Sequence, residues 1–287
     1  MMPTEASYFG VPGTLLFALV LFGSIAAFAY TASRRWQLLT IGGPPEVRWD
    51  RPLDRLRGLL ELGIFQKKMW WDGYAGLYHM LIFSGFVVLS VRTLSLILEG
   101  LFPKAGIPFL PLGAWQAYLL LKDVVLVTTF VGVLLALGRR YVFRRERLDP
   151  SFDAGFILCL IGFLMATDLL AGAAMFAMTP GHASAWEPVT AALSTFLAGA
   201  APGTLKAVYF SCWWLHLVAV FAFLNYLPFA KHFHVLTALP NIFLRKLDAP
   251  GKLSTVDIEK AAEAEKFGVA KVEDFTWKQR LDMFTCT

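Results

Sequence analysis

Five long apolar stretches limit the folds open to this chain of 287 residues. About 20 consecutive apolar residues are enough to cross the hydrocarbon core of a bilayer as a helix. Because the bilayer interior holds no water to bond the backbone, each spanning segment must be helical. The sequence therefore predicts an all-α integral membrane protein, a five-helix bundle. The five stretches are roughly residues 10–31, 74–99, 112–138, 152–178 and 206–234.

Composition agrees with this fold class, since 57% of the residues are hydrophobic and only 16% are charged. The first stretch has no Lys or Arg before it and is long enough to span. We therefore expect a retained helix and not a cleaved signal peptide.

Lys and Arg residues gather on alternate sides of the helices. Segments 32–73 and 139–151 are rich in arginine, whereas the loop after the second stretch holds only Lys104. The positive-inside rule then places the N-terminus outside and the C-terminus in the cytoplasm. The net charge of +5 reflects this asymmetry and an attraction to anionic lipids, so a nucleic-acid partner has little support.

Three of the five histidines lie in or near the last stretch, where an imidazole inside a membrane helix is costly and points to function. His216 and His234 are 18 residues apart, which predicts one helix face and about 27 Å along the axis. His232 would point elsewhere. The alternatives are a packed core histidine at His216 and an interfacial histidine at His234.

His79 supplies a partner from the second stretch, about one or two turns inside its cytoplasmic end. An antiparallel fifth helix brings His234 to the same depth. Two imidazoles from different helices are the axial ligands that a six-coordinate b-type haem needs. Glycines at 73, 76 and 85 would let the helix approach a flat macrocycle. Pro228 is expected to bend the fifth helix.

A second, outer haem would need a partner for His216. The expected region of the second stretch, VVLSVRT, contains no histidine. His182 in the loop TPGHASAWEP is an alternative, as are the methionines of the fourth stretch. One haem is therefore expected, and a second stays open.

Four charged residues lie inside apolar stretches: Arg92, Lys122, Asp123 and Asp168. Intramembrane charges face the bundle interior, pair with one another and mark proton or substrate paths. Together with His216 they predict an outer layer that binds a quinone or haem propionates. A structural Arg92–Asp168 salt bridge is the alternative.

The flanking segments are amphipathic or soluble. Residues 51–69 alternate leucines with basic residues and predict a helix on the inner membrane face, or a docking surface for a cytoplasmic partner. Residues 1–237 would form the membrane domain, and residues 238–287 a cytoplasmic linker with a short acidic helix. Cys159, Cys212 and Cys286 form no spacing motif, which excludes a disulfide framework.

With these histidines in place, the chain resembles the five-helix cytochrome b family of the respiratory nitrate reductase gamma subunit and the membrane cytochromes of heterodisulfide reductases. The matching elements are LYHMLIFSGF and LHLVAVFAFLNYLPFAKHFH. The resemblance covers about residues 10–240. The resemblance implies that His79 and His234 hold the inner haem. It also implies an outer haem held by His216 and by a histidine ten residues beyond His79 in the second helix. In this chain that second position is Leu89.

The tail KLSTVDIEKAAEAEKFGVAKVEDFTWKQRLDMFTCT resembles the linker of fusion proteins that continue into an iron–sulfur domain and a heterodisulfide-reductase-like domain. One group of them is proposed to link electron-transfer flavoprotein to menaquinone. Cys286 would then be the first cluster ligand. Because one cysteine cannot hold such a cluster, we expect no iron–sulfur cluster within residues 1–287, and a truncated sequence or a separate polypeptide carrying the remainder.

The resemblance implies a membrane module of a quinone-linked oxidoreductase in a bacterial or archaeal cytoplasmic membrane. It would pass electrons between a cytoplasmic iron–sulfur partner and the quinone pool through haem b. Two alternatives remain open: an ion or small-solute transporter lined by the intramembrane charges, and a passive anchor for a catalytic domain.

Overall fold

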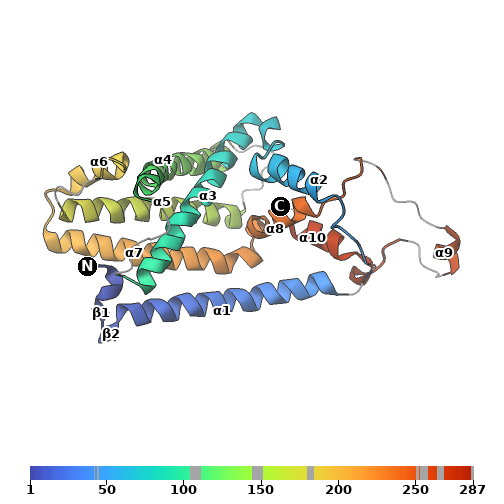
Figure 1. Cartoon of the computed structure of the whole chain (residues 1–287), viewed down its shortest axis with the longest axis horizontal. Helices are drawn as coiled ribbons and strands as arrows, with labels where there is room; N and C mark the ends of the chain where they lie inside the picture. Colours follow the sequence, from blue (N-terminus) through green and yellow to red (C-terminus); the bar gives the residue numbers. More distant parts are fainter. Residues whose placement is uncertain are drawn as a thin grey trace. The chain divides into compact units, whose positions relative to one another are not determined.

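The computed structural model describes residues 1–41, 43, 45–103, 111–143, 151–179, 184–249, 252, 258–263 and 268–285. Its helices include five that are long and apolar enough to cross a membrane (Figure 1). The prediction of an all-α membrane bundle is confirmed, and the chain is a multi-pass membrane protein. These spans are Gly13–Thr40 (α1), Gly73–Leu101 (α3), Leu112–Val142 (α4, Leu112–Leu137, and a π-helical turn), Phe152–Met178 (α5) and Pro202–Phe229 (α7, Pro202–Tyr226, and a 3-10 turn).

The described chain divides into two compact units. The first comprises residues 1–27 and 69–226, and the second comprises residues 28–68 and 227–287, so α1 contributes to both. A membrane domain that ends at residue 237 stays a prediction.

In the first unit, α3 packs against α4, α4 also contacts α5, and α5 packs against α7. A Cβ at Gly85 would collide with the Thr129 side chain, so this glycine brings α3 and α4 into close contact. Phe17 of α1 packs between Gly100 of α3 and Trp213 of α7. Short elements precede α1: a 3-10 turn (Pro3–Glu5) and a hairpin of β1 (Ser7–Tyr8) and β2 (Val11–Pro12).

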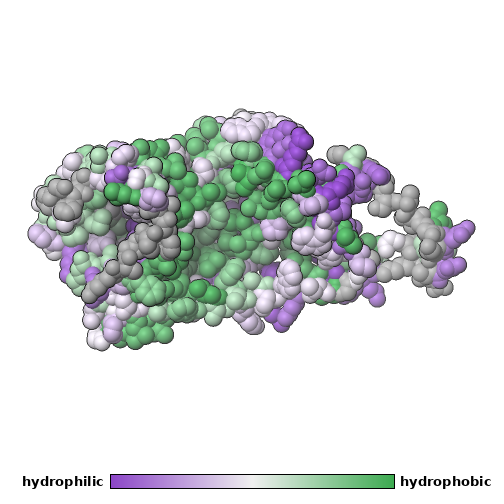
Figure 2. Space-filling view, viewed as in Figure 1, coloured by the Kyte–Doolittle hydropathy of each residue, from purple (hydrophilic) through white to green (hydrophobic). Residues whose placement is uncertain are grey.

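Large apolar side chains remain exposed along the spans, as expected of surfaces that face lipid. Leu19 and Phe22 of α1, Leu94 of α3 and Leu134 of α4 are all exposed. Figure 2 shows apolar side chains over much of the visible face of the long helices.

The sequence did not predict α6 (Pro188–Leu197), an apolar helix that packs against α5 and α4. Its ten residues are too few to span a bilayer, so it does not stand out as a spanning stretch in the sequence. Proline at its first position suits a helix start, where no amide donor is needed.

The fifth stretch is not one helix, which corrects the expectation for residues 206–234. Helix α7 ends at Tyr226, two short 3-10 turns follow, and α8 begins at His234 and runs to Phe243. Pro228 lacks an amide donor and its ring clashes with a preceding turn, so the helix stops there. His216 and His234 therefore lie on different helices, and the argument from one shared helix face was wrong.

The second unit is built from short helices. These are α2 (Pro52–Gly58), a π-helical turn η2 (Leu59–Ile64), α8 (His234–Phe243), α9 (Ile258–Glu263), a 3-10 turn (Val272–Asp274) and α10 (Trp277–Thr285). Helix α8 packs against α2, η2 and α10. The amphipathic helix expected over residues 51–69 is thus helical only as α2 and η2, up to Ile64, and its place on the inner membrane face stays a prediction. A further 3-10 turn, Met69–Trp71, belongs to the first unit.

Arg55 joins α2 to the end of α8. Its side chain is buried, and its Nη1 donates to the carbonyl oxygens of Phe243 and Arg245, each at 2.9 Å. Its Nη2 pairs with Asp50 at 2.6 Å, and this hydrogen bond lowers the pKa of the Asp50 carboxyl. The stabilising contribution of Asp50 is therefore present above an unfolded pKa of about 3.9 and is lost as pH falls through the lower folded value.

Replacing Arg55 with alanine is expected to destabilise the second unit by about 3 kcal/mol, because the partly buried carbonyl oxygens of Phe243 and Arg245 and the Asp50 carboxylate lose their charged donor. Limited proteolysis of the purified chain would show faster cleavage within residues 28–68. Arg57→Ala is the control, since the Arg57 side chain is 80% exposed and pairs with Glu61 at the surface. Its effect should stay below about 0.5 kcal/mol. Equal sensitivity of the two variants would contradict the role given to Arg55.

Candidate functional site

Charged side chains from α3 and α5 form a cluster in the first unit. The Nε of Arg92 donates to Asp168 Oδ1 at 3.3 Å, and its Nη1 lies 3.7 Å from Glu99 Oε2. The Asp168 side chain is 5% exposed, so this ion pair is buried. The structural pairing of Arg92 with Asp168 that the sequence left open is present.

The cluster contains more negative than positive charge. One guanidinium lies between two carboxylates, and a charge in the membrane interior is costly unless it is paired. The second oxygen of Asp168, Oδ2, is buried and has no hydrogen-bond partner among the described residues. This oxygen is therefore placed to accept a hydrogen bond or a proton from a bound hydroxyl group.

Glu99 was missed at the sequence level because it lies at the edge of the second stretch. A signal was available, since Glu99 follows Arg92 by seven residues, which is about two helical turns. Residues at that spacing share a helix face, so the pair could have been predicted.

His216 of α7 lies close enough to Asp168 for the two groups to interact electrostatically. Its Nδ1 is 3.1 Å from the Leu164 carbonyl oxygen and 3.1 Å from Thr167 Oγ1. The Thr167 hydroxyl donates to the Phe163 carbonyl at 2.9 Å, so we assign the Nδ1 proton to the bond with Leu164. That tautomer leaves a lone pair on Nε2, which suits either a metal ligand or a proton acceptor.

Lys122 and Asp123 of α4 hold α6 in place. Lys122 Nζ pairs with Glu187 Oε1 at 2.6 Å. Asp123 accepts from the backbone amides of Val189 and Thr190 and from the Thr190 hydroxyl, at 2.6, 3.2 and 2.6 Å. Asp123 thus caps the start of α6, so the structure gives it a structural role. Lys122 still contributes positive potential at Asp168.

His79 lies on α3 in the first unit and His234 begins α8 in the second, so their pairing stays a prediction. Both side chains are half-buried. Two imidazoles form a donor set that fits haem b, because a porphyrin needs only two axial ligands from the protein. In the described part of the chain, no group of three or more His, Cys, Asp or Glu could hold a metal ion.

Two of the glycines expected to face a macrocycle contact protein instead. A Cβ at Gly76 would meet the Met69 carbonyl oxygen at 2.5 Å, and one at Gly85 would meet Thr129. Around Gly73 there is open space, so that position could still lie against a flat group. His182 and Cys286 lie outside the described residues.

The five spans and their buried charges define a multi-pass membrane protein with an intramembrane polar site. No family model matches the chain, and no solved structure matches it.

Two curated proteins match nearly the whole chain, and both are described as oxidoreductases. It is 29% identical over 281 residues to the "Probable iron-sulfur-binding oxidoreductase FadF" of Bacillus subtilis. It is 23% identical over 286 residues to the "EtfAB:quinone oxidoreductase" of Syntrophomonas wolfei. The matches cover 98% and 96% of the chain but 39% of each relative, so the chain spans about two fifths of their length. These relatives support a membrane-associated oxidoreductase family.

Proposed function

We propose that the chain is the membrane module of a quinone-linked oxidoreductase, in a bacterial or archaeal cytoplasmic membrane. The observation that carries the proposal is the buried Asp168 oxygen without a partner, beside Arg92 and His216. The interconversion of quinone and quinol moves two electrons and two protons, so its site needs a group that accepts a proton and a cation that holds an oxygen. The similarity to a protein described as a quinone oxidoreductase supports this reading.

In the proposed site, the quinol hydroxyl donates to Asp168 Oδ2, and Arg92 holds the carboxylate in position. When Asp168 takes up a proton, Arg92 still has Glu99 as its counter-charge, at 3.7 Å. The negative partner therefore remains while the proton is held. His216 Nε2 serves as a second proton acceptor, and we prefer this role to an outer haem ligand because the matching position on α3 is Leu89.

We further propose that His79 and His234 hold one haem b, which would supply one-electron chemistry while the chain supplies ligands and electrostatics. The partner would be an iron–sulfur domain or subunit, since the Bacillus relative is described as an iron-sulfur-binding oxidoreductase. Because the Syntrophomonas relative is named for EtfAB, an electron-transfer flavoprotein is the donor or acceptor that we propose on the soluble side.

The experiment that tests the haem is a dithionite-reduced minus oxidised absorbance spectrum of the purified chain, with pyridine-haemochrome quantification. We expect a b-type α-band and about one haem per chain. About two haems per chain would contradict the proton-accepting role of His216 and make it a ligand. A colourless protein, expressed with haem supplied, would contradict the proposal and leave the transporter and anchor alternatives.

A further inference from the structure

The second unit contains a cavity of about 280 Å³ beside α2. At about 30 Å³ per water molecule this is ample room for a phosphate group. Three arginines and two carboxylates among its lining residues give a net charge of +1. The lining residues are Arg51, Asp54, Arg57, Gly58, Glu61, Arg245 and Leu247.

Arg245 is the residue that singles out this cavity. Its guanidinium lies on Gly58, where a Cβ would overlap it, and its backbone carbonyl is held by Arg55 at 2.9 Å. Its Nη1 is buried and has no hydrogen-bond partner among the described residues. A buried charged donor without an acceptor is costly, so its position fits an acceptor that comes from a ligand.

The other arginines leave donors for the same ligand. Arg57 Nε donates to Glu61 Oε1 at 3.1 Å, and Arg51 Nε lies 3.3 Å from Asp50 Oδ2, both at the surface. Each guanidinium carries five N–H donors, so one such bond leaves others available. Arginine forks match the oxygens of a phosphate group well.

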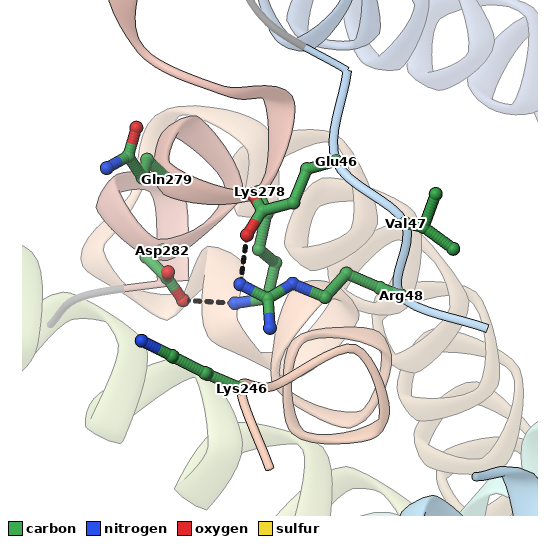
Figure 3. A pocket seen from close by; sticks show the side chains of 7 residues that line it. All are labelled: Glu46, Val47, Arg48, Lys246, Lys278, Gln279 and Asp282. Carbon is green, nitrogen blue, oxygen red and sulfur yellow. Dashed lines mark hydrogen bonds and ion pairs between the residues drawn. The ribbon is translucent and has the colours of Figure 1, made fainter. Parts of the chain in front are cut away.

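A second cavity, of about 470 Å³, lies in the same unit (Figure 3). Each of its three cations pairs with a carboxylate: Arg48 with Glu46, Lys246 with Asp248 at 4.0 Å, and Lys278 with Asp282 at 2.5 Å. Arg48 Nε is likewise buried without a hydrogen-bond partner, but the Arg48 guanidinium already has a carboxylate partner, whereas the Arg245 guanidinium has none among the described residues.

The segment that lines the smaller cavity also exposes apolar side chains. Leu53 is 80% exposed, and Leu56, Leu60 and Ile64 are exposed as well. An amphipathic segment of this kind lies in the membrane interface, with its apolar side chains among the lipid tails. The lipid phosphates lie at that level, and anionic headgroups attract clustered arginines.

We propose that the cavity lined by Arg245, Arg57 and Arg51 binds a phosphate group, and that the exposed leucines of α2 and η2 make an anionic phospholipid its source. The lipid phosphate accepts from Arg245 Nη1, and the acyl chains lie along the leucines. This site anchors the second unit to the membrane surface and does not depend on the redox proposal.

The test uses the purified, delipidated full chain in a neutral detergent. Short-chain phosphatidylglycerol, short-chain phosphatidylcholine and inorganic phosphate are each titrated, and bound ligand is counted by native mass spectrometry. Arg245→Gln removes the central donor group. Arg57→Gln changes an exposed residue, so it tests the site without a risk to folding. Arg34→Gln is the matched control, because Arg34 is exposed and lies outside the cavity.

We expect the wild type and Arg34→Gln to bind phosphatidylglycerol equally, and at least ten-fold more tightly than phosphatidylcholine. Each cavity variant should weaken phosphatidylglycerol binding by about ten-fold. Equal binding by Arg57→Gln and Arg34→Gln would overturn the site. Inorganic phosphate that binds as tightly as phosphatidylglycerol would overturn the lipid as its source.

Discussion

Replacing His79 or His234 with alanine is expected to lower the haem b content from about one per chain to nearly none. A b haem of this kind is held by two axial imidazoles, so the loss of either leaves an open coordination position and a weakly held porphyrin. Haem content is measured by pyridine haemochrome on protein purified from cells supplied with haem. Far-UV circular dichroism of the same samples checks that the helices remain.

His232→Ala is the matched control for this prediction. The ring of His232 lies 5.9 Å from that of His234, so the control removes a neighbouring imidazole of the same chemistry. It should keep the wild-type haem content. If His234→Ala also kept its haem while His232→Ala lost it, the ligand assigned to α8 would be wrong.

Replacing Asp168 with asparagine is expected to slow quinol oxidation by at least about 100-fold while haem content stays at the wild-type level. Asparagine keeps the size of the side chain and can still contact Arg92, but it cannot take up a proton. Loss of a positioned proton acceptor typically costs about 10²–10⁴-fold in rate. Arg92 keeps Glu99 as a counter-charge in this variant, so the bundle should remain folded. The rate is measured by stopped-flow haem reduction with a menaquinol analogue.

Asp153→Asn makes the same chemical change on the same helix, fifteen residues earlier and so about 22 Å away along α5. Its rate of haem reduction should match the wild type. Slowing of both variants to the same degree would indicate a general effect of charge removal on α5, and would remove the special role of Asp168.

The spanning helices could be predicted from the sequence because the bilayer sets both their length and their composition. The structure confirms five helices that can span, and it also contains the Arg92–Asp168 pair, which the sequence left open as the alternative to a quinone-binding layer. Such predictions succeed where one physical constraint decides the secondary structure. Here that constraint is the lack of water in the membrane interior, which requires each spanning segment to be helical.

The break between α7 and α8 was harder to predict, because LNYLPFAKHFH remains apolar enough to continue a helix. A bend at Pro228 was expected, but not that the helix would end before this proline and restart at His234. The capping of α6 by Asp123 was hidden for a different reason. It depends on a tertiary contact between residues more than sixty positions apart.

The most direct test of the quinone link is the anaerobic addition of a reduced menaquinone analogue to the purified, haem-loaded chain. We predict that the reduced b-type α-band appears and that its amplitude follows the quinol concentration. If dithionite reduces the haem but excess quinol leaves it oxidised, a quinone-linked role for this chain is contradicted.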